Sequence, residues 1–190
     1  MRGVVANERL TATVATVLLV LLAVEGATLL DMRRYLSVHA FVGILLIPVV
    51  ALKLTTTGWR MLRYYLGADE YVQRGPPHII LRALVAPVVV VSTVFLFATG
   101  VALLVLDETH GQVVRIHQAS FIVWVGAMSI HVLTRLPRLS AAWRRVPGRS
   151  MRLGLVGGTL AAGLVLAVAV LPAVDQLQDT MTAHAGFDDR

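Results

Sequence analysis

Long apolar runs constrain the fold of this chain more than any other feature of the sequence. We expect runs near residues 10–30, 36–57, 78–106, 114–136 and 153–174. A run of about 18 or more apolar residues is typical of a helix that crosses a bilayer. Only 15% of the 190 residues are charged, against about a quarter in an ordinary soluble domain. The sequence therefore predicts an all-α integral membrane protein with about five transmembrane helices.

The charged residues predict the orientation of these helices. The amino-terminal segment and the connections 53–74 and 135–152 lie on one side and carry most of the Lys and Arg residues. Basic connections remain in the cytoplasm according to the positive-inside rule. We therefore expect a multi-pass protein of the bacterial cytoplasmic membrane, with its amino terminus inside and its carboxyl terminus outside. The net charge of +6 then reflects contacts with membrane lipid, and nucleic acid is not an expected partner.

The chain contains no cysteine. Disulfides, thiolate catalysis, iron–sulfur clusters and covalently attached c-type haem are therefore excluded.

Histidine spacing is the main indication of chemistry. His117 opens the fourth run and His131 lies fourteen positions later, which places them about 21 Å apart on nearly one helix face. Trp124 lies on the same face. A low-spin haem iron takes two axial imidazoles, and electron transfer across a bilayer needs a haem near each surface. This spacing is typical of the ligands of two stacked haems in a four-helix cytochrome b. The alternative is that both histidines simply lie at the membrane interfaces.

A partner for His117 is expected on the second run. His39 opens that run, which crosses the membrane in the same direction as the fourth, so both histidines lie at similar depth near the outer surface. Gly43 follows one helical turn later and would leave room for a porphyrin, although ordinary helix packing explains it equally well. We therefore predict an outer haem bound by His39 and His117.

The inner site is less defined by the sequence. His78 starts the third run at the depth of His131 and is the favoured partner for a second haem. Lys53 lies fourteen positions after His39 and is expected to reach the interface or a haem propionate. Arg60 is at a suitable depth for a propionate as well.

Two further intramembrane charges are candidates for function, because an ionisable residue inside a span is costly. Glu25 in the first run could accept a proton during quinol oxidation or pair with Arg33 or Arg34. Arg82 in the third run could neutralise a propionate.

The chain divides into three parts on this interpretation. Residues 1–136 form a four-helix, cytochrome b-like bundle. Residues 137–174 form a cytoplasmic loop and an extra Gly-rich span, which packs against the bundle or against another subunit. Residues 175–190 form a polar extracytoplasmic tail.

The stretch from Val24 to Leu136 resembles a family of small bacterial, especially actinobacterial, membrane proteins grouped with b-type cytochromes. The similar segments are Val24-Glu25-Gly26, His39 to Gly43, Leu52 to Arg60, Arg63-Tyr64-Tyr65, Gly75-Pro76-Pro77, His117 to Phe121 with Trp124, and His131-Val132-Leu133. The resemblance implies haem binding at His39, His117 and His131. It differs at Arg135, where family members often have a further His, and His78 has no regular counterpart.

The leading hypothesis is a membrane haem b protein, with one or two bis-His haems, that relays electrons between the quinone pool and an extracytoplasmic partner or acceptor. A quinone is a candidate second cofactor, and any oxidoreductase activity would come from a quinone pocket near one haem. One alternative is a non-redox accessory or anchor subunit of a larger membrane complex. Another is a small ion or proton transporter that uses Glu25, Lys53 and Arg82.

Overall fold

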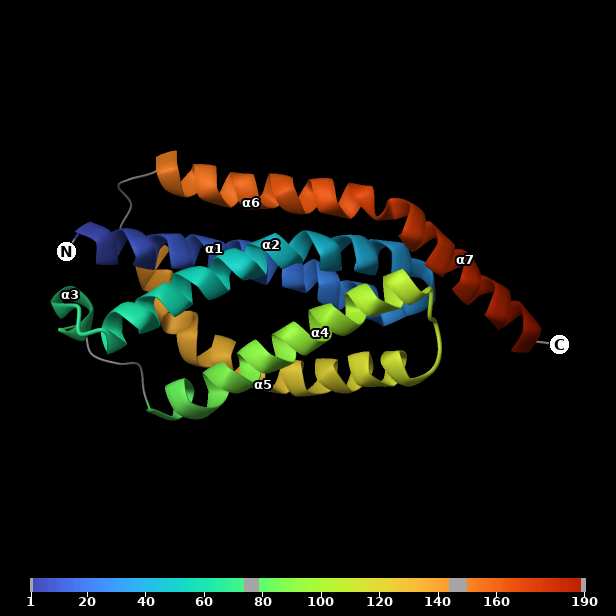
Figure 1. The fold of residues 1–190 in the computed structure, drawn as a ribbon, viewed down its shortest axis with the longest axis horizontal. Helices are drawn as coiled ribbons and strands as arrows, with labels where there is room; N and C mark the ends of the chain where they lie inside the picture. The colour runs from blue at the N-terminus through green and yellow to red at the C-terminus, as the bar shows by residue number, and fades with distance from the viewer. Residues whose placement is uncertain (1, 74–78, 144–149, 189–190) are drawn as a thin grey trace.

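The computed structural model describes residues 2–73, 79–143 and 150–188, and every regular element in these ranges is helical (Figure 1). The prediction of an all-α protein is confirmed for this part of the chain. The elements are α1 (Arg2–Thr28), the 3-10 turn η1 (Leu29–Asp31), α2 (Met32–Tyr65), α3 (Asp69–Val72), the π-helical turn η2 (Leu81–Val85), α4 (Ala86–Leu106), α5 (Gln112–Trp143), α6 (Ser150–Ala169) and α7 (Leu171–Asp188).

Four described segments are long and apolar enough to cross a membrane: Val4–Tyr65, Ala83–Leu106, Gln112–Thr134 and Arg152–Ala169. The first has 62 residues, which is far more than the roughly 20 that one crossing needs. It contains both α1 and α2, which lie side by side (Figure 1). These lengths and compositions indicate a multi-pass membrane protein.

Two helical hairpins form the body of the molecule, α1 with α2 and α4 with α5. Asp31 begins α2, where its side chain accepts a hydrogen bond of 3.2 Å from the Arg34 backbone N–H. Asp107 ends α4 in the left-handed conformation, and Gly111 has a φ of 101° before α5 begins. These residues reverse the chain, so both hairpin turns lie at one end of the molecule, here named the turn end. The start of α1 and α3 lie at the opposite, amino-terminal end (Figure 1).

Helix α6 packs along α2 and closes the main core. The buried apolar residues of this core come from α1, α2 and α6: Val14, Leu18, Val42, Leu46, Val49 and Val156. Gly163 allows the close approach, because a Cβ at that position would lie 2.5 Å from the Leu45 carbonyl oxygen. The two hairpins, in contrast, make few contacts with one another.

Helix α7 includes the segment for which the sequence predicts a polar tail. It bends away from α6 and runs across the turn end (Figure 1). Gln176 donates to Asp107 at 2.9 Å, and Thr180 donates to the same carboxylate at 3.0 Å. Gln178 donates to the Arg33 carbonyl at 3.0 Å. These hydrogen bonds connect α7 to the ends of both hairpins.

We expect Thr180→Val to loosen α7. The variant keeps the shape of the side chain but loses the hydroxyl that binds Asp107, and a hydrogen bond of this kind contributes about 1 kcal/mol. Hydrogen–deuterium exchange should therefore speed up about fivefold across α7. Thr182→Val is the control, because that hydroxyl donates only locally, to the Asp179 carbonyl. Equal exchange in the two variants would contradict this account of α7.

Candidate functional site

The structure brings His39 and His117 together at the turn end. His39 lies in the third turn of α2 and His117 in the second turn of α5, so each follows its own hairpin turn. Their ring centres are 6.5 Å apart and the ring planes cross at 89°. The predicted proximity of these two residues is therefore observed.

The neighbours of His39 determine which of its ring nitrogens carries the proton. Nδ1 lies 3.0 Å from Glu25 Oε1 and 3.0 Å from Thr28 Oγ1. The Thr28 hydroxyl has one proton and donates it to the Glu25 carbonyl at 2.6 Å, so it accepts from the ring. A carboxylate also accepts. Both contacts assign the proton to Nδ1 and leave a lone pair on Nε2.

His117 has the same arrangement on the other hairpin. Its Nδ1 lies 3.0 Å from Thr99 Oγ1. The Thr99 hydroxyl donates to the Phe95 carbonyl at 2.7 Å, so it too accepts from the ring. Gly100 faces the imidazole, and a Cβ there would lie 3.2 Å from its Cε1 atom. His117 also forms a hydrogen bond with the Leu96 backbone. Here again Nδ1 has an acceptor within the hairpin.

The separation of the two rings fits a pair of axial ligands. An imidazole nitrogen lies about 2.0–2.1 Å from a bound metal and roughly 1.1 Å from its own ring centre, so two opposed imidazoles have centres about 6.3 Å apart. The observed value is 6.5 Å. Metal-bound histidines also characteristically donate their second nitrogen to a carboxylate or another acceptor, as both Nδ1 atoms do here.

The His39–His117 pair offers two protein ligands to a metal. The described residues contain no group of three or more His, Asp or Glu side chains that could hold a metal ion. A haem iron needs only two ligands from the protein, because the porphyrin supplies four nitrogens. His39 and His117 provide this number.

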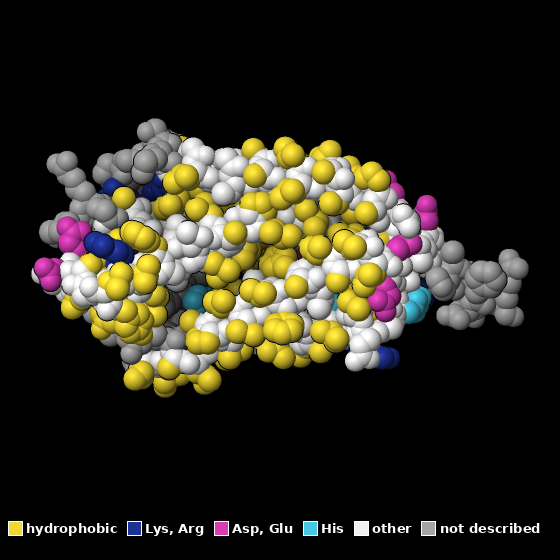
Figure 2. All heavy atoms as spheres, viewed as in Figure 1, with side chains coloured by type: hydrophobic (Ala, Val, Ile, Leu, Met, Phe, Trp, Pro, Cys, Tyr) yellow, Lys and Arg dark blue, Asp and Glu magenta, His cyan; other side chains and the backbone are white. Residues whose placement is uncertain are grey.

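The seam between the two hairpins is loosely filled. No side chain in Gln112–Thr134 of α5 is fully buried. Figure 2 shows the surface hollowed between α2 and α4 toward the amino-terminal end.

Gly43 and Trp124, two further residues predicted to bind the cofactor, each contact other side chains of the protein. A Cβ on Gly43 would lie 3.5 Å from Glu25 Oε1, an ordinary contact distance, so Gly43 lies beside the carboxylate. The Trp124 indole N–H donates to Thr93 at 2.9 Å, and its ring stacks on Phe121 with centres 6.4 Å apart. Trp124 thus connects α5 to α4, and its N–H is already used in a hydrogen bond.

The residues predicted for an inner site lie toward the amino-terminal end. Lys53 Nζ donates to the Thr11 carbonyl at 3.0 Å. Arg60 lies 3.8 Å from Glu8, and both side chains are about one-third or more exposed. His131 is partly buried on α5. His78 lies outside the described residues, so its pairing with His131 stays a prediction.

Sequence reasoning missed three residues of this site, Thr28, Thr99 and Gly100, and the contact of Glu25 with His39. Glu25 was expected to accept a proton or to pair with Arg33 or Arg34. Its carboxylate pairs with His39, and the role as a proton acceptor stays a prediction. The hairpin geometry could have indicated these contacts. In an antiparallel hairpin, residues equally distant from the turn lie opposite one another, and Thr99 and His117 flank the turn at 107–111 almost symmetrically.

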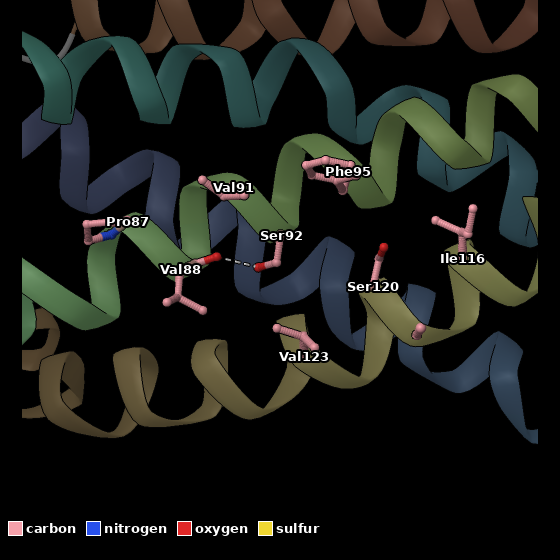
Figure 3. A pocket seen from close by; sticks show the side chains of 9 residues that line it. Pro87, Val88, Val91, Ser92, Phe95, Ile116, Ser120 and Val123 are labelled. Atoms are coloured by element: carbon pink, nitrogen blue, oxygen red, sulfur yellow. Dashed lines mark hydrogen bonds between the residues drawn. The ribbon is translucent and has the colours of Figure 1, made fainter.

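A separate groove lies between α4 and α5 (Figure 3). It encloses about 520 Å³, and its walls are apolar except for two serines. Ser92 is already bonded to the Val88 carbonyl at 2.7 Å. The groove carries no charged side chain among its lining residues, so it suits a hydrocarbon chain rather than a polar ligand. Its lining residues are Pro87, Val88, Val91, Ser92, Phe95, Ile116, Ala119, Ser120 and Val123.

Comparison with known proteins adds no relative: no family model, no curated protein and no solved structure matches this chain.

Proposed function

We propose that this chain is a membrane electron-transfer protein that holds haem b between its two hairpins, with His39 and His117 as the axial ligands. One observation carries the proposal. Two imidazoles from different hairpins lie 6.5 Å apart, and the Nδ1 atom of each has an acceptor within its own hairpin, an arrangement typical of imidazoles that bind a metal through Nε2.

The bound haem would supply a one-electron iron couple. The protein contributes the orientation and the environment. Thr28 and Thr99 hold the two imidazoles in the tautomer that ligation requires. The helices that carry the two histidines are apolar, and an apolar environment strengthens the electrostatic effect of nearby charges.

The proposal includes a topology of five spans, α1, α2, α4, α5 and α6. The 62-residue apolar segment that contains α1 and α2 supports two crossings instead of one. With the amino terminus in the bacterial cytoplasm, the turn end and α7 face outward. The His39–His117 pair then lies near the outer surface, within reach of an extracytoplasmic partner. Membership of the b-type cytochrome family that the sequence resembles is part of this proposal.

The proposal also includes a second haem at His131. His78 is the expected second ligand, and Lys53 or Arg60 would face the propionates. A relay from one side of the membrane to the other requires this inner haem, or a quinone that reaches the outer one.

The quinone pool is the proposed electron donor. The test is to mix the haem-loaded protein in lipid nanodiscs with a short-chain quinol and to follow the absorption of the reduced haem in a stopped-flow instrument. We expect rapid reduction, followed by reoxidation when a soluble ferric acceptor is added. A haem that dithionite reduces but quinol does not would contradict the quinone link. A folded protein without haem would instead favour the accessory-subunit alternative.

A further inference from the structure

Glu25 is an acidic residue inside an apolar helix, a position where an ionisable residue is a candidate for a functional role. Its side chain is 17% exposed, and Oε1 lies 3.0 Å from Nδ1 of His39. Its second oxygen, Oε2, is buried and makes no hydrogen bond with the described residues. A charged group at membrane depth is costly unless a partner compensates for it. The only ion-pair partner of Glu25 among the described residues is His39.

The surroundings keep the carboxylate in this position. Gly43 has no side chain on the face that Glu25 approaches, where a Cβ would lie 3.5 Å from Oε1. Thr28 is buried, and its hydroxyl bridges the Glu25 carbonyl and the His39 ring. The end of α1 is thereby joined to α2 at the point where the carboxylate meets the imidazole.

The two histidines differ in the charge of the groups that contact their rings. His117 contacts only neutral groups among the described residues, the Thr99 hydroxyl and the Leu96 backbone, whereas His39 contacts a hydroxyl and a carboxylate. A carboxylate that accepts the Nδ1 proton raises the electron density of the ring, and the ring becomes a stronger donor to a metal through Nε2.

We infer that Glu25 is the positioning residue for His39, and that it sets the reduction potential of the outer haem. The inference rests on the proposed function. Glu25 holds His39 in the Nδ1–H tautomer, so that Nε2 presents its lone pair to the iron. Its negative charge favours the more positively charged ferric state, and so does the stronger ligand. Both effects lower the midpoint potential of the haem.

The test compares the midpoint potential of the wild-type protein with those of Glu25→Gln and Thr28→Val, each measured by spectroelectrochemical titration of the purified, haem-loaded full chain. Gln keeps the size of the side chain and removes its charge. We expect Glu25→Gln to retain haem and to shift the potential to a more positive value. Thr28→Val removes only a neutral acceptor from the same nitrogen, so its shift should be clearly smaller.

The outcomes separate this inference from the proposed function. An unchanged or more negative potential in Glu25→Gln overturns the inference and leaves the haem proposal in place. A wild-type protein without haem overturns the haem proposal itself. If Glu25→Gln alone loses haem, the ¹⁵N spectrum of labelled histidine in the haem-free proteins decides. Because a Gln amide oxygen can still accept the Nδ1 proton, this comparison uses haem-free Glu25→Leu, which has no acceptor there. Conversion of His39 to the Nε2–H tautomer in Glu25→Leu supports positioning by Glu25, and retention of the wild-type tautomer overturns it.

Discussion

Substitution of either His39 or His117 by alanine is expected to remove the outer haem completely. In the proposed site each imidazole would supply one of the two axial bonds to the iron, and an alanine methyl group can supply none. The remaining imidazole would then hold the haem alone, between hairpins that make few contacts with each other. The measurement is the haem b content per chain after purification, together with the Soret and α bands of the reduced protein.

The control for these variants is His110→Ala. His110 is exposed in the turn at 107–111 and bonds to the adjacent Thr109 at 2.9 Å. It lies at the same end of the molecule, yet it is not expected to contact the haem, so His110→Ala should keep the full haem content. Full haem content in both His39→Ala and His117→Ala would refute the assigned ligands, provided that circular dichroism shows the wild-type helix content.

Gly163→Ala is expected to have the largest effect on the stability of the fold. The new Cβ would lie 2.5 Å from the Leu45 carbonyl oxygen, and this contact is with backbone, which cannot rotate away. Helix α6 must therefore move off α2 and give up part of the core around Val156. Overpacking of this kind costs about 1–3 kcal/mol, which we expect as a lower midpoint of unfolding in detergent on titration with SDS.

Gly158→Ala is the matched control on the same helix. A Cβ at Gly158 meets nothing within 4 Å in the monomer. Alanine also favours the helix over glycine by up to about 1 kcal/mol, so Gly158→Ala should leave the unfolding midpoint unchanged or raise it. A fall equal to that of Gly163→Ala would show that helix α6 does not dock on α2 through Gly163.

The helical fold and the His39–His117 pair could be predicted from the sequence because both depend on local patterns. Apolar runs of membrane length predict helices. Alternation of direction from one span to the next places His39 and His117 at the same depth, and the structure brings them within 6.5 Å. No knowledge of side-chain packing was needed for either prediction.

The remaining contacts depend on which faces of the helices pack together. The sequence of a single helix does not predict that packing. Gly163 approaches Leu45 only because α6 returns along α2. The polar sequence from Gln176 onward is typical of a tail. This segment instead forms part of helix α7, where it bonds to residues distant in the chain. Gln176 bonds to Asp107, 69 residues away, and Gln178 bonds to the Arg33 carbonyl near the start of α2.

The absorption spectrum of the purified wild-type chain tests the central claim most directly. The protein is expressed with ample haem, and its reduced-minus-oxidised spectrum is recorded alongside pyridine haemochrome quantitation. We predict a low-spin b-type spectrum with at least one haem per chain, and about two if His131 also binds one. A folded, helical protein with no Soret band would contradict the assignment of His39 and His117 as haem ligands.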